Sequence, residues 1–241
     1  FKPDAVVGVG GYASGPIGRV AAEAGIPLIL QEQNSYAGVT NKLLAKKACK
    51  ICVAYEGMER FFEKKKIIFT GNPVRKDLLQ AREIRAEGIE FYGLDASKKT
   101  ILVTGGSLGA GTLNKAVMRC LKDIGQWQEV QVLWQCGSYY YEDLKKQLDG
   151  KLPENVKLLA FLKRMDLAYA AADIVVARAG AGTISELVMI RDTEAEERLE
   201  QVLTGLLSDE KQRKELEKHI AKLAIRDSDE QIAREILKVI G

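Results

Sequence analysis

Short apolar runs alternate with amphipathic segments along the first two-thirds of the chain. The amphipathic segments, at 15–24, 39–48 and 75–87, have the spacing of helices. The apolar runs are rich in β-branched residues and end at glycine or polar clusters, which is typical of strands. They predict strands at residues 4–10, 27–31, 50–54, 67–70, 100–104, 130–135, 156–160 and 173–177. This alternation predicts βα units, and therefore an α/β fold with parallel sheets.

The last part of the chain, from Asp192 onward, has helical signals only. Ser208 predicts one helix start, and two further pairs have the spacing of capping boxes, Thr193 with Glu196 and Ser228 with Gln231. The helix at 183–190 runs into this part with no strand between, whereas each earlier helix of its series is followed by a strand. We therefore expect the second βα series to be one strand short at that join.

Two consecutive βα series predict two Rossmann-like domains that join near Pro73. We expect the first domain at residues 1–74, the second at 75–227, and a separate C-terminal helix at 228–241. The residues are 46% hydrophobic and 29% charged, which is ordinary for a protein with a sizeable core.

Charge and hydropathy narrow the classes of partner and compartment. The net charge of +3 is small and spread along the chain, which argues against nucleic acid as a partner. No apolar run approaches the ~20 residues that cross a bilayer, and the first residues lack the pattern of a signal peptide. These features predict a soluble, cytoplasmic protein.

Cysteine and histidine usage argues against metal chemistry. Cys49 and Cys52 form a C-x-x-C pair, but no second pair completes a zinc set, and the other cysteines, Cys120 and Cys136, stand alone. The single histidine, His219, lies in a charged helical segment. We therefore expect structural thiols, no metal, no cofactor, and no Ser-His-Asp mechanism.

Gly105–Ala110 (GGSLGA) follows the strand at 100–104 and opens a helix. Glycines let the backbone approach an anion, and a helix N-terminus offers free N–H groups, so this loop can cradle a phosphate. It lacks the Walker lysine and the full dinucleotide fingerprint, which argues against ATP and NAD. A tight turn with Ser107 as the helix N-cap explains the motif equally well.

A second small-residue loop, 178–186 (RAGAGTISE), follows the strand at 173–177. Loops at the carboxyl ends of strands line the crevice where α/β folds bind ligands. Glu186 there has two readings. It forms a capping box with Thr183, or it accepts hydrogen bonds from ribose hydroxyls, as acidic residues do in dinucleotide folds.

Polar and glycine-rich segments also end the first two predicted strands. The loop at 8–16 (GVGGYASGP) contains four glycines, and 31–34 (QEQN) forms a row of amide and carboxylate groups. Such a row is costly to bury without partners, so it faces either solvent or a ligand. Because both segments leave the same edge of the predicted sheet, we favour a ligand.

Taken in order, GGYASGP, EQN followed by GVTN, GNPVR, GGSLGA and RAGAGTISE resemble the peptidoglycan N-acetylglucosaminyltransferases of the MurG type over nearly all of residues 1–190. The resemblance implies a GT-B-like fold, with two Rossmann-like domains facing across a cleft and a helical C-terminal segment. It also implies that the N-terminal domain is partial, because the family's first glycine-rich loop belongs upstream of Phe1, and that a strand and a glutamine-bearing loop are lacking after Ile190.

The resemblance assigns roles to individual residues. Ser107 and Gly109 fall in the loop that approaches the donor diphosphate, Arg75 matches a donor-site arginine, and the backbone of Leu162 falls where the uracil is held. The remaining matches flank the ribose and uridine (Ala181, Gly182, Thr183, Ile184, Ser185, Glu186) or lie on the acceptor side, where sugar and acceptor meet (Gly11, Tyr12, Asn34).

The activity implied is transfer of N-acetylglucosamine from UDP-N-acetylglucosamine to undecaprenyl-linked N-acetylmuramyl-pentapeptide, inverting and without a metal, on the cytoplasmic face of the cell membrane. A hydroxyl of the acceptor attacks as UDP leaves, which needs a general base, and Glu32 is the candidate in this chain. Two alternatives stay open at this point: another UDP-sugar enzyme of the same architecture, such as a UDP-N-acetylglucosamine 2-epimerase, and a non-catalytic UDP-binding fragment.

Overall fold

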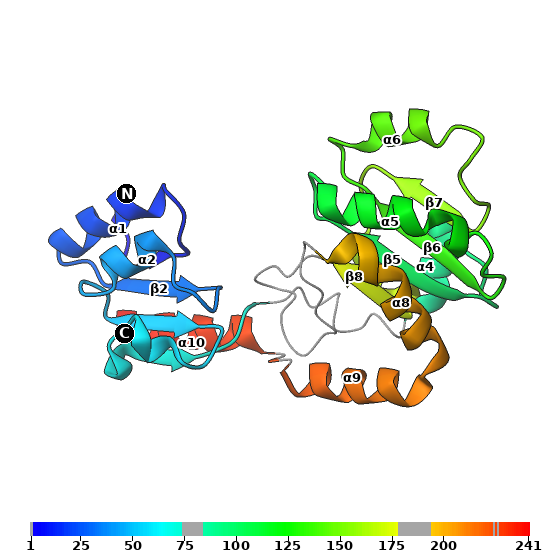
Figure 1. Cartoon of the computed structure of the whole chain (residues 1–241). Coiled ribbons are helices and arrows are strands. Elements are labelled where there is room, and N and C mark those ends of the chain that lie inside the picture. Colours follow the sequence, from blue (N-terminus) through cyan, green and yellow to red (C-terminus); the bar gives the residue numbers. More distant parts are fainter. Residues whose placement is uncertain (1, 74–83, 178–193, 224, 226) are drawn as a thin grey trace. The chain divides into compact units, whose positions relative to one another are not determined.

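The computed structural model describes residues 2–73, 84–177, 194–223, 225 and 227–241, with the side chains of 219–223 excepted. The chain folds into two compact units. Unit 1 comprises Phe1–Val74 together with Leu223–Gly241, and unit 2 comprises Arg75–Lys222. Figure 1 shows a sheet and its own covering helices in each. No helix in the described ranges is both long and apolar enough to span a bilayer.

Unit 1 is built on a parallel sheet in the order β1-β2-β3-β4. Its strands are Val6–Gly8, Leu28–Glu32, Lys50–Val53 and Ile67–Phe69. Helices α1 (Ser14–Glu23) and α2 (Val39–Leu44) belong to this unit, and short 3-10 turns cover Met58–Arg60 and Lys64–Lys66. Alternate strand residues share one core cluster with Leu44 of α2, as the period of two in a strand requires; they include Leu28, Leu30, Ile51 and Val53.

The C-terminal helix α10 (Ser228–Ile240) packs against the first sheet rather than standing as a separate segment. Ile232 of α10 joins a core cluster with Ile29 and Cys52, the strand residues that alternate with those of the other cluster. Both faces of this sheet are therefore covered, which is the usual state of a parallel sheet. The first unit is thus completed by residues from the far end of the sequence (Figure 1).

Unit 2 contains a second parallel sheet in the order β7-β6-β5-β8. Its strands are Lys99–Thr104 (β5), Val130–Gln135 (β6), Val156–Leu159 (β7) and Ile174–Ala177 (β8). Its helices are α4 (Arg85–Tyr92), α5 (Gly111–Ile124), α6 (Tyr141–Gln147), α7 (Met165–Ala171), α8 (Ala195–Ser208) and α9 (Glu210–Leu223). One face of the sheet packs against α5 and α8 around the fully buried Trp134, and the other packs against α7.

Every predicted strand is present, with ends that differ by at most two residues. Two predicted helix starts are wrong. Ser208 is the last residue of α8, and the carboxylate of Asp209 accepts a hydrogen bond from a backbone amide in the first turn of α9. Ser228 already lies inside α10, whose N-cap is Asp227, and Gln231 bonds that aspartate. In both places a neighbouring aspartate occupies the capping position, where aspartate is at least as favourable as serine.

Candidate functional site

The candidate donor site of unit 2 lies at the carboxyl ends of its strands. In a parallel sheet all strands point the same way, so the loops that follow β5, β6, β7 and β8 leave from one edge. Ligands of open α/β folds bind outside this edge. The loop after β5 is Gly105–Ala110, and it leads directly into α5 at Gly111.

The β5–α5 loop is a tight turn that needs glycine at two positions. Gly106 and Gly109 have φ angles of 82° and 86°, a region in which residues with a Cβ are strained. The turn is closed by a hydrogen bond of 2.9 Å from the Gly109 amide to the Gly106 carbonyl. Ser107 lies at the tip of this turn and is exposed.

The glycines of this loop differ in the space around them. A Cβ on Gly109 would lie 2.0 Å from the carbonyl oxygen of Cys136, and a Cβ on Gly105 would lie 2.4 Å from the amide of Ala110. A Cβ on Gly106 would meet nothing within 4 Å. Close packing of the protein itself therefore explains two of the glycines, whereas the third borders open space at the edge where a ligand is expected.

The structure decides against Ser107 as the N-cap of α5. The helix begins at Gly111, its N-cap is Ala110, and no side chain caps it. The amides of Gly111, Thr112 and Leu113 have no hydrogen-bond acceptor among the described residues. Free amides at the start of a helix attract anions, because they are donors and carry the positive end of the helix dipole.

Leu162, three residues after β7, contributes its side chain to the core and leaves its main chain available. Its side chain is 4% exposed and packs with Leu102, Leu133 and Ala168. Within the described ranges, no hydrogen bond involves its backbone N–H or C=O. The backbone of Leu162 is therefore available for the contact to a base that the resemblance implies.

The other predicted donor residues, Arg75 and Ala181–Glu186, lie outside the described residues. The strand that precedes the second of these segments ends at Ala177, which pairs with Thr104, the last residue of β5. The chain therefore leaves β8 directly beside the β5–α5 loop.

In unit 1, the residues that are predicted to contact the acceptor substrate also follow the ends of strands. Gly11, in the loop after β1, has a φ of 79°, and its carbonyl accepts a hydrogen bond of 3.0 Å from the Thr40 hydroxyl. Tyr12 beside it is 94% exposed. Asn34 follows β2 and is also exposed. The two strands pair directly, so the two loops leave neighbouring positions of the sheet.

The surroundings of Glu32 do not support its predicted role as general base. Its side chain is 1% exposed, and its two oxygens accept four hydrogen bonds of 2.9–3.1 Å. The donors are the amide and side chain of Asn34, the amide of Gly38 and the side chain of Asn41. A carboxylate has about four acceptor positions, so none is left for the proton of a substrate. Glu32 instead holds the loop that carries Asn34.

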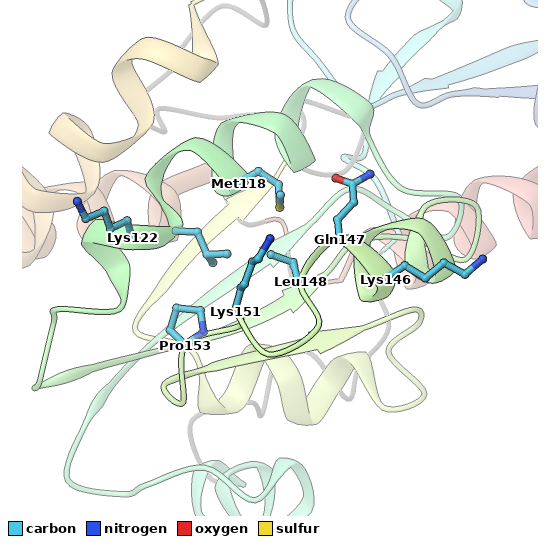
Figure 2. A pocket seen from close by; sticks show the side chains of 8 residues that line it. Met118, Lys122, Lys146, Gln147, Leu148, Lys151 and Pro153 are labelled. Carbon is cyan, nitrogen blue, oxygen red and sulfur yellow. The ribbon is translucent and has the colours of Figure 1, made fainter.

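A hollow of about 700 Å³ in unit 2 contains none of the predicted site residues (Figure 2). It is lined by the second half of α5 and by the end of α6 with the segment that follows it: Met118, Leu121, Lys122, Lys146, Gln147, Leu148, Lys151 and Pro153. The β5–α5 loop precedes the other end of α5, and a helix of this length extends about 20 Å. The hollow is therefore not the predicted donor site.

The chain matches two family models. Residues 1–53 match the glycosyltransferase family 28 N-terminal domain, and residues 100–191 match the glycosyltransferase family 28 C-terminal domain.

Curated relatives match along the whole chain. A protein of Parabacteroides distasonis is 47% identical in an alignment that covers 100% of this chain and 74% of the relative. A protein of Flavobacterium psychrophilum is 44% identical and is covered to 73%. Both are named UDP-N-acetylglucosamine--N-acetylmuramyl-(pentapeptide) pyrophosphoryl-undecaprenol N-acetylglucosamine transferase.

Solved structures show the same architecture. The MurG of Acinetobacter baumannii superposes with a TM-score of 0.66 at 27% identity, covering 98% of this chain and 74% of that one. A UDP-GlcNAc 2-epimerase from Neisseria meningitidis, bound to UDP-GlcNAc, has a TM-score of 0.74 at 16% identity, covering 99% and 77%. At that identity the likeness shows the fold alone, which is the predicted GT-B-like α/β fold. With relatives this similar over its whole length, the chain belongs to glycosyltransferase family 28, among the N-acetylglucosaminyltransferases of the MurG type.

Proposed function

We propose that this chain transfers N-acetylglucosamine from UDP-N-acetylglucosamine to undecaprenyl-linked N-acetylmuramyl-pentapeptide. The observation that carries the proposal is the 47% identity, along the entire chain, with a relative that bears the name of this activity. The β5–α5 loop adds a physical reason, because its open glycine and free helix amides suit the diphosphate of a nucleotide sugar.

The chemistry of the leaving group determines where catalysis resides. As the bond to the sugar breaks, negative charge grows on the diphosphate of UDP. Preorganised amide donors stabilise such charge without reorganisation, and this is often the largest contribution to catalysis. We assign this task to the amides of Gly111–Leu113 and to the tip of the loop at Ser107, with Arg75 as a further cationic group. No step of this scheme requires a metal.

The other contacts of the donor follow from the same assignment. Leu162 would hold the uracil through its backbone, and Ala181–Glu186 would surround the ribose and uridine, with Glu186 accepting hydroxyl hydrogen bonds. On unit 1, Gly11, Tyr12 and Asn34 would contact the acceptor or the transferred sugar. We propose that Glu32 positions Asn34 and is not the base.

The acceptor's chemistry implies a place of action. An undecaprenyl chain stays in the bilayer, so an enzyme that acts on the sugar it carries works at the membrane surface. We therefore propose a peripheral position on the cytoplasmic face of the cell membrane. Sedimentation with vesicles that contain the lipid-linked acceptor, compared with vesicles that lack it, tests this position.

The test of the activity uses UDP-N-acetylglucosamine with and without the lipid-linked acceptor. UDP release that depends on the acceptor supports the transferase. Conversion of the donor to its C2 epimer without an acceptor would instead support a 2-epimerase, and UDP binding without either product would support a non-catalytic fragment. Omitting the acceptor from an otherwise identical reaction is the control that separates these outcomes.

A further inference from the structure

Gln135 connects the two loops that the proposed function assigns to the diphosphate and to the uracil. We propose that Gln135 is a positioning residue for the nucleotide, and that it fixes the β5–α5 loop relative to the loop after β7. This inference rests on the proposed donor site in unit 2. From the sequence, Gln135 was predicted only as the last residue of the strand at 130–135.

The side-chain amide of Gln135 makes three hydrogen bonds at the carboxyl edge of the sheet. Gln135 is the last residue of β6 and is 2% exposed. Its nitrogen donates to the carbonyl of Gly106 at 2.8 Å and to the carbonyl of Ala160 at 3.2 Å. Its oxygen accepts from the hydroxyl of Thr104 at 2.7 Å. One buried side chain therefore contacts the end of β5, the loop after β5 and the loop after β7.

These bonds hold the open glycine of the diphosphate loop from both sides. The Gly106 amide faces the Thr104 hydroxyl at 3.4 Å, and the Gly106 carbonyl accepts from Gln135 and from the Gly109 amide. Gly106 has a left-handed φ and empty space beside its Cα, so without these partners its conformation would be weakly determined. Gln135 thus helps to select one conformation of the loop.

The hydrogen bond from Gln135 to the carbonyl of Ala160 extends the restraint to the loop after β7. Ala160 lies two residues before Leu162, whose backbone groups have no partner within the described ranges. A nucleotide that contacts both loops binds more tightly when they are already held in the right relation, because less conformational freedom is lost on binding. A ligand that contacts only one loop gains less from this connection.

The chain contains a matched counterpart at the opposite end of the same strand. Gln131, the second residue of β6, is 7% exposed and also makes three hydrogen bonds. Its oxygen accepts from the Asp95 amide at 2.9 Å, and its nitrogen donates to the Asp95 carbonyl at 2.8 Å and to the Thr100 hydroxyl at 3.0 Å. Thr100 pairs with Gln131 as Thr104 pairs with Gln135. Gln131 therefore makes a similar set of stabilising hydrogen bonds, but at the end of β6 that is far from the proposed site.

The experiment compares Gln135→Met with Gln131→Met. Each variant removes the three hydrogen bonds of a buried side chain and keeps the length of that side chain. Dissociation constants for UDP, uridine and pyrophosphate are measured by calorimetry, and unfolding is followed by tryptophan fluorescence. Both tryptophans of the sequence, Trp127 and Trp134, lie in unit 2, so this signal reports on the unit that contains the site.

We expect both variants to be less stable than the unchanged protein. Gln135→Met should weaken UDP binding by about tenfold or more, the effect of roughly one lost hydrogen-bond contribution. It should change the affinities for uridine and for pyrophosphate by clearly smaller factors. Gln131→Met should leave all three affinities unchanged. A loss of UDP affinity equal in both variants, or no loss in Gln135→Met, would overturn the inference.

A second matched pair covers the case in which Gln135→Met does not fold. Thr104→Val removes one hydroxyl from the network of Gln135, and Thr100→Val removes the corresponding hydroxyl from that of Gln131. UDP affinity should fall only in Thr104→Val, and equal affinities would contradict the inference. If the unchanged protein does not bind UDP, the proposed function itself fails. If it binds UDP and the variants bind equally well, only the role of Gln135 fails.

Discussion

Replacing Gly109 by alanine tests whether the β5–α5 loop has the close packing that the structure describes. The new Cβ would lie 2.0 Å from the carbonyl oxygen of Cys136 and 3.0 Å from the Cα of Gly137. An ordinary contact needs more than 3 Å, so one of the two loops must move by about an ångström, and overpacking of this kind costs about 1–3 kcal/mol. The left-handed φ of 86° adds about 1–2 kcal/mol.

The sum, about 2–5 kcal/mol, corresponds to a fall of about 4–20 °C in the unfolding temperature of a unit of this size. Tryptophan fluorescence measures the unfolding temperature of unit 2, because both tryptophans lie in that unit. Gly106→Ala is the matched control, because it has the same kind of φ but its Cβ meets nothing within 4 Å. Strain alone predicts a fall of about 2–8 °C for the control. Equal shifts in the two variants would refute the packing argument.

Gly88→Ala should destabilise unit 2, although alanine usually favours a helix, because its Cβ would lie 2.4 Å from the carbonyl of Leu167; a higher unfolding temperature would contradict this. In the native protein a thiol reagent should modify the exposed Cys49 rapidly, and the three buried cysteines only after unfolding. Burial raises the pKa of each buried thiol, so that less of the reactive thiolate is present. Mass spectrometry of tryptic peptides identifies the modified positions. The hydrogen bond from Arg164 lowers the pKa of Asp166 below its ordinary value of 3.8, so its stabilisation is complete above that value and is lost as the pH falls through the lowered pKa. Asp166→Asn should therefore be less stable at pH 7, and denaturant titrations should show the difference shrinking at low pH; a difference independent of pH would count against this pair.

The strands could be predicted because each is a short apolar run with its own turn signals. In a parallel sheet covered on both faces, the strand residues are apolar almost without interruption, and Val130–Gln135 was predicted with the correct ends. Helix starts were harder to predict, because Ser208 and Asp209 are both capping residues and the sequence does not show which backbone position the helix takes.

The site could be predicted only where its residues are close together in the sequence. The β5–α5 loop is a local motif, and the structure excludes Ser107 as N-cap, an alternative that the sequence left open. The role of Glu32 depends on donors up to nine residues away, and that of Gln135 on carbonyls 25 and 29 residues away. Neither set of partners leaves a periodic pattern. The packing of α10 on the first sheet likewise joins the two ends of the chain.

The most direct test of the donor site is a crystal structure of the protein with UDP-N-acetylglucosamine. The account predicts diphosphate oxygens within hydrogen-bonding distance of the amides of Gly111–Leu113, beside the open face of Gly106. A nucleotide bound elsewhere in unit 2, for example in the lysine-rimmed hollow of Figure 2, or a β5–α5 loop filled by the protein's own side chains, would contradict it.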